Sequence, residues 1–414
     1  MKSIQVNAEL LSGCEYFDSD QRREALADMF GFDRRRVILG DGAVEMLAEE
    51  CRRLTAQRVM LVHDPALPHL EAQVRSILER GGAELIGTFC DIVPNPTVPS
   101  VDALAAAVRA SGCDAVIAMG GGSTMDSAKV GLCVATSGGT ASDYFGFDLF
   151  KTPANWPLIA VPSTAGTGAE ASRVSVIATD AGKQAVYSDY IQPQVAIVDP
   201  GLTRDLPPAL TAITGLDALG HALECTASKK SNDIGDAVAR EALRSGLPYI
   251  VAATEEGAAN PLARYHMARA SLLGGLLLSP INTGAAHALG YGIERIAHEK
   301  GAPVPHGTAV ALVLPGVMTH NAPAVAHKYY YAAGVAGLDL CGKGQEEGVE
   351  LAAGFVDDVR RQHTAFGSLT SSGLGEEDIP RMTEIAMTVR RLLDPNPVEI
   401  TPEDAERIYR GVLH

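Results

Sequence analysis

Residues 115–129 read AVIAMGGGSTMDSAK, and this stretch decides the fold. Its first five residues are a continuous apolar run, which is typical of a buried parallel strand. Three glycines and a serine follow at once, and a helical pattern begins at Thr124. A strand, a glycine turn and a helix N-terminus in this order can bind a pyrophosphate, because unpaired N–H groups and the helix dipole attract an anion. The spacing matches neither GxGxxG nor GxxxxGK[ST], and the alternative is a tight turn, which would need fewer glycines.

The same alternation of strand and helix extends on both sides of this stretch. Short apolar or β-type runs occupy residues 36–39, 59–62, 84–88 and 158–161, and helical patterns separate them. Repeated βαβ units predict a parallel sheet. After residue 200 the composition changes. Ala- and Leu-rich segments, such as 237–253 and 262–278, have apolar residues at three- and four-residue spacing. We therefore predict a Rossmann-like α/β domain over residues 1–200 and an all-helical domain over residues 201–414.

The composition limits the possible partners and location. The formal net charge of −16 argues against nucleic acid and anionic membranes, because binding to phosphates requires clustered Lys and Arg. The seven cysteines are scattered and never form a CxxC pair, as expected of reduced intracellular thiols. The first twenty residues contain no apolar run that would suit a signal peptide, and no uninterrupted apolar stretch is long enough to span a bilayer. We predict a cytoplasmic protein.

Two further features suggest a dinucleotide. The loop PSTAGTGAE at residues 162–170 follows another buried strand, and its small and hydroxyl side chains could line a phosphate or a ribose. Asp64 stands at the end of the strand over residues 59–62, where a carboxylate can accept hydrogen bonds from an adenosine ribose. Because a carboxylate there would repel a 2′-phosphate, it favours NAD over NADP.

Candidate metal ligands occur in the second half. Asp217 and His221 are four residues apart in a helical pattern, so both point from one helix face. A carboxylate oxygen with an imidazole nitrogen suits Fe(II) or Zn(II), although such a pair often only forms a hydrogen bond. His287 and His306 supply further imidazoles.

Together these motifs resemble the iron-containing (group III) alcohol dehydrogenase family. The ordered series runs from about Val37 to the C-terminus, and no role is assigned to residues 1–36. The motifs are PNPT at 94–97, GGGSTMDSAK at 120–129, PSTAGTGAE at 162–170, AIVDP at 196–200, TAITGLDALGHALE at 211–224, PHG at 305–307, NP at 396–397 and TPED at 401–404.

The resemblance implies a fold, cofactors and site residues. The family has the dehydroquinate synthase-like fold, in which NAD(H) and a divalent metal meet in a cleft between a Rossmann-like and a helical domain. Members commonly form dimers or higher homo-oligomers. The implied cofactor-binding residues are Asp64, Gly120, Gly121, Gly122, Ser123, Asp126, Ser163, Thr164, Thr167 and Lys183. The implied metal ligands are Asp217, His221 and His306.

The fourth ligand departs from the family pattern. The family usually has two histidines four residues apart on the helix before the last ligand, and here only the second, His287, is present, while Thr283 occupies the place of the usual ligand. Three possibilities follow: His287 joins the metal, three side chains and a water hold it, or the enzyme works without metal. We expect His287 to be a ligand or to lie near the metal. If it is not a ligand, its imidazole could act in catalysis by relaying the hydroxyl proton.

The resemblance predicts an NAD-dependent, metal-assisted alcohol dehydrogenase or aldehyde reductase for a small substrate. The alternatives are a lyase similar to dehydroquinate synthase and a metal-free, non-catalytic homologue. The altered segment with Asn282 and Thr283 resembles that of family branches that reduce aldehydes carrying a sulfonate or phosphonate. Arg173, beside the second loop, is a candidate to bind such an anion. A guanidinium suits such an anion, but Arg173 could equally form an ordinary salt bridge.

Overall fold

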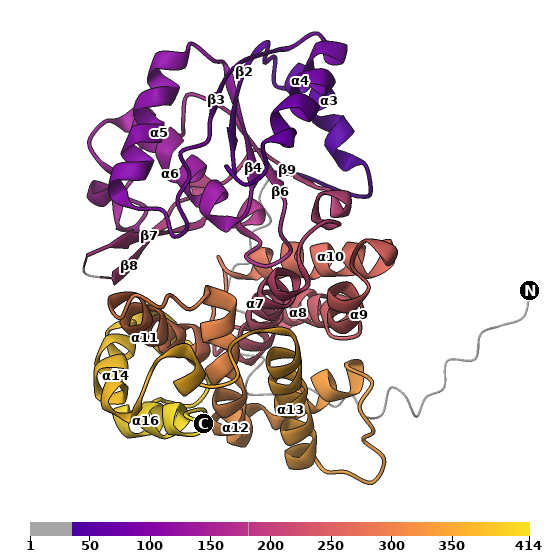
Figure 1. Cartoon of the computed structure of the whole chain (residues 1–414), viewed down its shortest axis with the longest axis vertical. Helices are drawn as coiled ribbons and strands as arrows, with labels where there is room; N and C mark the ends of the chain where they lie inside the picture. Colours follow the sequence, from indigo (N-terminus) through magenta and orange to yellow (C-terminus); the bar gives the residue numbers. More distant parts are fainter. Residues whose placement is uncertain (1–34, 181) are drawn as a thin grey trace, which may run out of the picture. The chain divides into compact units, whose positions relative to one another are not determined.

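The computed structural model describes residues 35–180 and 182–414 (Figure 1). Residues 1–34, to which the sequence assigned no role, lie outside the described part. The strands and longer helices of the first half are β1 (Arg36–Leu39), α3 (Leu47–Arg53), β2 (Arg58–His63), α4 (His69–Gly81), β3 (Glu84–Phe89), α5 (Val98–Ser111), β4 (Ala115–Gly120), α6 (Gly122–Ser137), β5 (Gly146–Phe147), β6 (Leu158–Pro162), β7 (Val174–Thr179), β8 (Gly182–Tyr187) and β9 (Val195–Val198).

Six of these strands form the predicted parallel sheet, in the order β1-β9-β6-β4-β2-β3. The central strand β4 is buried along its whole length, because helices cover both faces. Val116 and Ala118 belong to one apolar cluster with α5 and α6. Ile117 and Met119 point to the other face and join a cluster with α3 and α4. The alternation of side chains along one strand therefore builds two cores.

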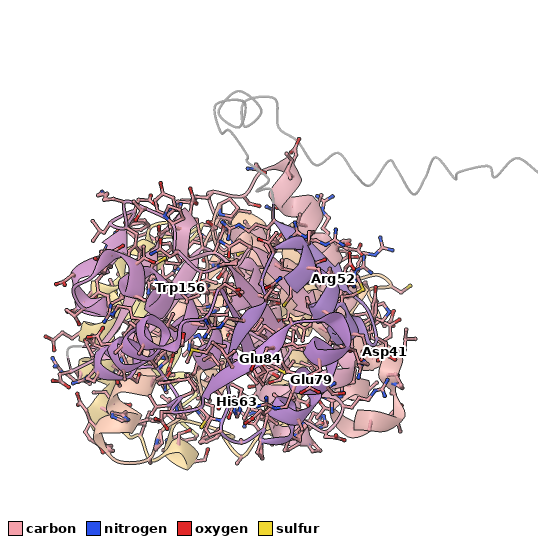
Figure 2. The ribbon with its side chains drawn as sticks, turned by 90° about the horizontal axis from the view of Figure 1, so that it is seen from above. Asp41, Arg52, His63, Glu79, Glu84 and Trp156 are labelled. Carbon is pink, nitrogen blue, oxygen red and sulfur yellow. The ribbon has the colours of Figure 1, made fainter. Side chains whose placement is uncertain are left out.

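Trp156, the single tryptophan of the chain, connects two segments that precede central strands. Figure 2 labels Trp156 in the view from above. Its indole N–H donates to the backbone carbonyl of Cys113 at 2.9 Å. Trp156 comes shortly before β6 and Cys113 shortly before β4, so this bond joins the two segments at the amino edge of the sheet. The carboxyl edge, where the candidate cofactor loops lie, is at the opposite end of these strands.

A second sheet was not predicted from the sequence. It has three strands in the order β5-β8-β7, and β7 and β8 form an antiparallel hairpin. The hairpin follows the loop at residues 162–170 and places Lys183 and Tyr187 on the same face of β8, since side chains two residues apart share a face. Both side chains line the pocket described below.

The second half is helical, as predicted, and its helices run from pink to yellow in Figure 1. They are α7 (Pro208–Ala227), α8 (Asp233–Gly246), α9 (Ile250–Glu255), α10 (Pro261–Leu277), α11 (Ala285–Glu299), α12 (His306–Val335), α13 (Gln345–His363), α14 (Ile379–Thr388), α15 (Arg390–Leu393) and α16 (Pro402–Arg410). The predicted domain boundary near residue 200 lies between the end of β9 and the start of α7, and we keep it as a proposal.

Two helical segments differ from the expectation. The Ala-rich stretch 237–253 is divided between α8 and α9, with Pro248 in the break, because proline has no N–H and disfavours helical backbone before it. Helix α12 is long and apolar enough, by length and composition, to cross a membrane. However, it contacts α13, α7 and α11, and Ala309 to Leu314 are fully buried in the helical core. We therefore interpret α12 as a core helix.

The two domains touch closely where the second candidate loop meets α10. Gly168 has a φ of +59°, and a Cβ added to Gly275 would lie 2.1 Å from the carbonyl oxygen of Gly168. Only glycine at position 275 allows the loop and the helix to approach this closely. The loop at residues 162–170 is therefore fixed by the helical domain as well as by β6.

We predict that Gly275→Ala lowers the melting temperature and displaces the 162–170 loop, because the new methyl group overlaps backbone atoms that cannot rotate away. Thermal unfolding followed by circular dichroism measures the effect. Gly354→Ala is the control, since Gly354 lies in α13 with no atom within 4 Å of an added Cβ. It should leave stability unchanged or raise it by up to about 1 kcal/mol. Equal melting temperatures for the two variants would contradict this account of the contact.

Candidate active site

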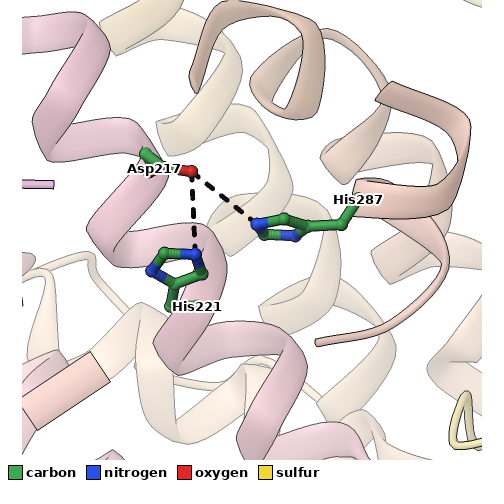
Figure 3. A group of neighbouring side chains, drawn as sticks. All are labelled: Asp217, His221 and His287. Atoms are coloured by element: carbon green, nitrogen blue, oxygen red, sulfur yellow. Dashed lines mark ion pairs between the residues drawn. The ribbon is translucent and has the colours of Figure 1, made fainter. Parts of the chain in front are cut away.

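One carboxylate oxygen lies at the centre of a cluster of imidazoles. Asp217 and His221 stand one turn apart on α7, His287 comes from α11, and Figure 3 shows both rings directed at the same carboxylate. The distances from Asp217 Oδ1 are 3.8 Å to Nε2 of His221, 3.7 Å to Nε2 of His287 and 3.7 Å to Nε2 of His306, the first residue of α12. Four side chains from three helices therefore converge on one point.

This cluster fits a divalent metal. Metal–ligand bonds of about 2.0–2.2 Å place neighbouring ligand atoms of a tetrahedral site about 3.4 Å apart, close to the separations seen here. The ligand atoms of Asp217, His221 and His287 all lie within 4.8 Å of one another; His306 lies outside this tightest group but faces Asp217 at 3.7 Å. Asp217 Oδ1 and His287 Nε2 are buried and have no hydrogen-bond partner among the described residues. Buried polar atoms without partners are rare, and a bound cation would satisfy both.

The charges in the cluster are coupled. Burial alone would raise the pKa of Asp217, but His221, His287 and His306 together hold that pKa well below its usual value. Burial lowers the pKa of His221 to about 4, against the attraction of Asp217, so this ring is neutral near pH 7. An ionised carboxylate and a neutral imidazole are the forms that bind Zn(II) or Fe(II).

Two glutamates orient the imidazoles from behind. Glu224, on α7, accepts a hydrogen bond from Nδ1 of His287 and also accepts the backbone N–H of Ala286 at 2.6 Å. Glu294, on α11, accepts from Nδ1 of His306 at 2.6 Å. Each carboxylate fixes the ring so that Nε2 faces Asp217. Such partners usually set the orientation and the basicity of metal-binding histidines.

The candidate cofactor loops meet at the N-terminus of α6. Gly121 caps this helix without a side-chain hydrogen bond, so the first N–H groups remain available to an anion. A Cβ added to Gly122 would lie 2.7 Å from Thr167, and one added to Gly121 would lie 3.5 Å from Thr164. Ser163 donates its backbone N–H to the carbonyl of Gly120 at 2.9 Å. The glycine turn and the 162–170 loop are therefore in direct contact.

The remaining cofactor candidates have identified partners. Asp64 Oδ1 accepts the N–H of Ala66 at 2.9 Å, and the Asp64 N–H donates to Met119, beside the glycine turn. The Asp126 carboxylate accepts the N–H of Val176 at 2.9 Å, so it connects α6 to β7. Lys183 is ion-paired with Glu294. Because Glu294 also accepts a hydrogen bond from His306, it connects Lys183 to the metal cluster.

One pocket connects the two groups of residues. The predicted site residues that line it are Gly122, Ser123, Asp126, Thr167, Lys183, Asp217, His221, Asn282, Thr283, His287 and His306. Asp64, Gly120, Gly121, Ser163 and Thr164 lie outside its lining, in the loops and strand end that support it. A cofactor with its phosphates at the α6 N-terminus can therefore reach the metal cluster.

The structure separates Thr283 from His287 at the start of α11. Gly284 is the N-cap of α11, so Thr283 precedes the helix and lines the pocket, while His287 lies in the first turn of the helix. His287 Nε2 lies 3.7 Å from Asp217 Oδ1. Of the three possibilities for the metal, we therefore propose the first, in which His287 is a ligand.

Arg173 does not line the pocket. Its guanidinium forms ion pairs with Asp148 and with Asp189, the latter at 2.9 Å from Nε. This is the ordinary salt bridge that the sequence left open, and two carboxylates already balance its charge. The cationic residues that line the pocket are instead Lys183 and Arg391.

Several site residues were missed in the sequence. Glu224, Glu294, Tyr187, Tyr291 and Arg391 all contact predicted site residues or line the pocket. The helical spacing from His287 could have indicated Tyr291. For Arg391, more than a hundred residues from His287 in the chain, the sequence offered no signal.

Comparison with known proteins identifies similar sequences along nearly the whole described chain. Residues 34–200 match the family model "Iron-containing alcohol dehydrogenase", and residues 211–413 match "Fe-containing alcohol dehydrogenase family, C-terminal". Long-chain-alcohol dehydrogenase 1 of Geobacillus thermodenitrificans is 32% identical over 383 residues, which cover 91% of this chain and 94% of that protein.

Two solved structures are similar in fold. A 1,3-propanediol oxidoreductase has a TM-score of 0.86 and 30% identity, with 93% of this chain and 100% of that one covered. Sulfoacetaldehyde reductase from Bifidobacterium kashiwanohense in complex with NAD+ has a TM-score of 0.81 and 29% identity, with 93% and 99% covered.

We predict that Glu224→Gln weakens the binding of Zn(II) by about 10- to 100-fold, because the amide lacks the charge that orients His287 and increases its basicity. Competition with a chromophoric chelator measures the dissociation constant. Glu350→Gln, an exposed substitution on α13, should leave it unchanged. Unaltered zinc affinity in the folded Glu224→Gln protein would contradict the role given to this carboxylate.

Proposed function

Because the chain belongs to the iron-containing alcohol dehydrogenase family, we propose that it is an NAD-dependent, metal-assisted dehydrogenase that interconverts a small alcohol and its aldehyde. The main support is the single pocket that is lined both by the α6 N-terminus and by the cluster around Asp217. A metal-assisted hydride transfer needs both a dinucleotide phosphate site and a set of metal ligands in one cavity.

The two cofactors supply the chemistry that side chains cannot. Asp217, His221, His287 and His306 would hold a divalent metal, which would supply Lewis-acid chemistry at the substrate oxygen. NAD(H) supplies or accepts the hydride. The protein binds and aligns both groups, so that the reacting carbons lie close together.

The residues of the chain divide this task between them. Free N–H groups at the start of α6 bind the pyrophosphate, and Thr167 lines the pocket beside them. Glu224 and Glu294 hold two imidazoles in place, and burial of the cluster limits access of water. Nδ1 of His287 is held by Glu224, and its Nε2, which faces Asp217 at 3.7 Å, has no hydrogen-bond partner among the described residues. We therefore assign His287 to the metal rather than to proton relay.

We also propose that the enzyme is cytoplasmic and homo-oligomeric. Six cysteines lie in the described residues and all are free, which suits a reducing compartment. The homo-oligomer rests on the family resemblance, and sedimentation of the purified protein tests it directly.

The proposed reaction predicts a strict metal requirement. We expect the chelated enzyme to lose at least about 100-fold in the rate of NADH oxidation, because Lewis-acid stabilisation is worth several kcal/mol and each 1.36 kcal/mol is tenfold in rate. Absorbance at 340 nm with short neutral and anionic aldehydes measures the rate before and after readdition of Fe(II) or Zn(II). NAD binding without NADH consumption on any aldehyde would favour the lyase or the non-catalytic homologue.

Asp64 predicts the cofactor preference. We expect Asp64→Ser to reduce the ratio of kcat/KM for NADH over NADPH by about tenfold, because it removes one repulsion of the 2′-phosphate, while the hydroxyl can still accept the N–H of Ala66. Steady-state kinetics with both cofactors gives the ratio. Asp41→Ser, at an exposed carboxylate paired with Arg204, is the control and should leave the ratio unchanged. An unchanged ratio in Asp64→Ser would refute this assignment.

A further inference from the structure

Arg391 is a pocket cation that no carboxylate of the described residues neutralises. It comes from the short helix α15 and lines the same pocket as the Asp217 cluster. Its Nη1 donates to the hydroxyl of Tyr187 at 3.1 Å and its Nη2 to the hydroxyl of Tyr291 at 3.4 Å. Within residues 35–180 and 182–414, no ion pair of Arg391 with Asp or Glu is present. Its charge is therefore available to a ligand.

The other pocket cation is already balanced. Lys183 is ion-paired with Glu294, which also accepts from His306. Arg390, the neighbour of Arg391, points elsewhere and pairs with Asp394 at 2.6 Å, with both side chains more than half exposed. Lys183 and Arg390 thus each have an ion pair with a carboxylate, and Arg391 has none among the described residues.

The groups around Arg391 are hydrogen-bond donors. The guanidinium has five N–H groups, and two of them contact the tyrosine oxygens. Asn282 Nδ2 donates to the Tyr187 hydroxyl at 3.3 Å and to the backbone carbonyl of Arg391 at 3.3 Å. Both phenol oxygens therefore accept bonds from nitrogen, and their own hydrogens have no acceptor in the described part of the chain. A guanidinium with two phenol O–H groups suits an oxyanion.

The surrounding structure fixes this arrangement. The Arg391 guanidinium carbon lies 5.9 Å from the ring centre of Tyr187 and 5.6 Å from that of Tyr291. Asn282 has a φ of +73°, a conformation that residues other than glycine adopt uncommonly and that is concentrated at functional sites. Its side-chain Oδ1 also accepts the N–H of Thr283 at 3.0 Å.

Arg391 and its two tyrosine partners lie a short distance from the metal ligands. The Tyr291 ring is 5.7 Å from the His306 ring, centre to centre, and Arg391 contacts the same tyrosine through its hydroxyl. His306 in turn faces Asp217 at 3.7 Å. A small molecule whose oxygen is at the Asp217 cluster can therefore place its other end at Arg391.

We propose that Arg391, with Tyr187, Tyr291 and Asn282, binds an anionic group on the substrate, so that the enzyme prefers short aldehydes and alcohols that end in a carboxylate, sulfonate or phosphonate. This inference rests on the proposed function for the identity of the reacting end. It moves the recognition of the anion from Arg173, which two aspartates neutralise, to a residue inside the pocket.

The test compares aldehydes of similar length and different charge on the metal-loaded full chain. The set is succinic semialdehyde, sulfoacetaldehyde, phosphonoacetaldehyde and neutral butanal. We expect at least one anionic aldehyde to exceed butanal by tenfold or more in kcat/KM, and the best of the three identifies the anion. Arg391→Gln should lower kcat/KM for that aldehyde by about 100-fold, with butanal changed less than about threefold, because a charged pair in the pocket is lost.

Two matched variants separate recognition from stability. Arg390→Gln should change neither aldehyde, and Arg391→Lys, which keeps the charge without the planar fork, should lose about tenfold on the anionic aldehyde. The KM for NADH should be the same in all of these proteins. Preference of the wild type for butanal, an equal loss on both aldehydes in Arg391→Gln, or an effect only on the KM for NADH would overturn the inference.

A binding measurement distinguishes this inference from the proposed function. Methanesulfonate, methylphosphonate and propionate should raise the melting temperature of the wild type, and at least one should compete with butanal. Neither effect should occur in Arg391→Gln. If no aldehyde is reduced but the anions still stabilise only the wild type, the anion site stands and the proposed reaction fails. If the anions do not bind the wild type, the anion site fails whatever the activity.

Discussion

The rest of this structure depends on how the buried negative charge of Asp217 is balanced. An unpaired charge in a protein interior is strongly unfavourable, and Asp217 is only 3% exposed. Three imidazoles surround its Oδ1, and a bound divalent cation would offset its charge. This arrangement needs α7, α11 and α12 to meet closely. A Cβ on Gly307, directly after His306, would lie 2.1 Å from the carbonyl of Ile213, so glycine there lets the start of α12 reach α7.

The same pocket shows why net charge says little about a substrate. The chain carries a formal charge of −16, and acidic groups surround the metal cluster. Nevertheless each of the buried glutamates behind the cluster has a partner: Glu224 holds His287, and Glu294 holds His306 and Lys183. Of the two Lys and Arg side chains that line this pocket, Arg391 is the one without an ion pair to a carboxylate of the described residues, so the local field beside it has the sign opposite to that of the whole protein.

Much of the fold could be predicted from the sequence because local patterns determine it. The parallel strands are continuous apolar runs, and the glycine turn after Met119 has a backbone requirement that is visible in the letters. The hairpin of β7 and β8 was missed: β7 reads VSVIAT, a strand-like run that was not singled out, and β8 begins with Gly, Lys and Gln, which interrupt the apolar pattern. For the site, spacing placed Asp217 and His221 on one helix face, but only the structure shows that His287, from a different helix, faces the same carboxylate. The sequence cannot show which of Arg173 and Arg391 is available to bind an anion, because the residues that contact each guanidinium are distant in the chain.

The most direct test of the account is the location of the metal. Crystals of protein loaded with iron or zinc, measured at the absorption edge of that metal, give an anomalous difference map. The account predicts one strong peak per chain, bounded by Oδ1 of Asp217 and by Nε2 of His221, His287 and His306. A peak that excludes His287, or no peak between these side chains in crystals grown with excess metal, would contradict it.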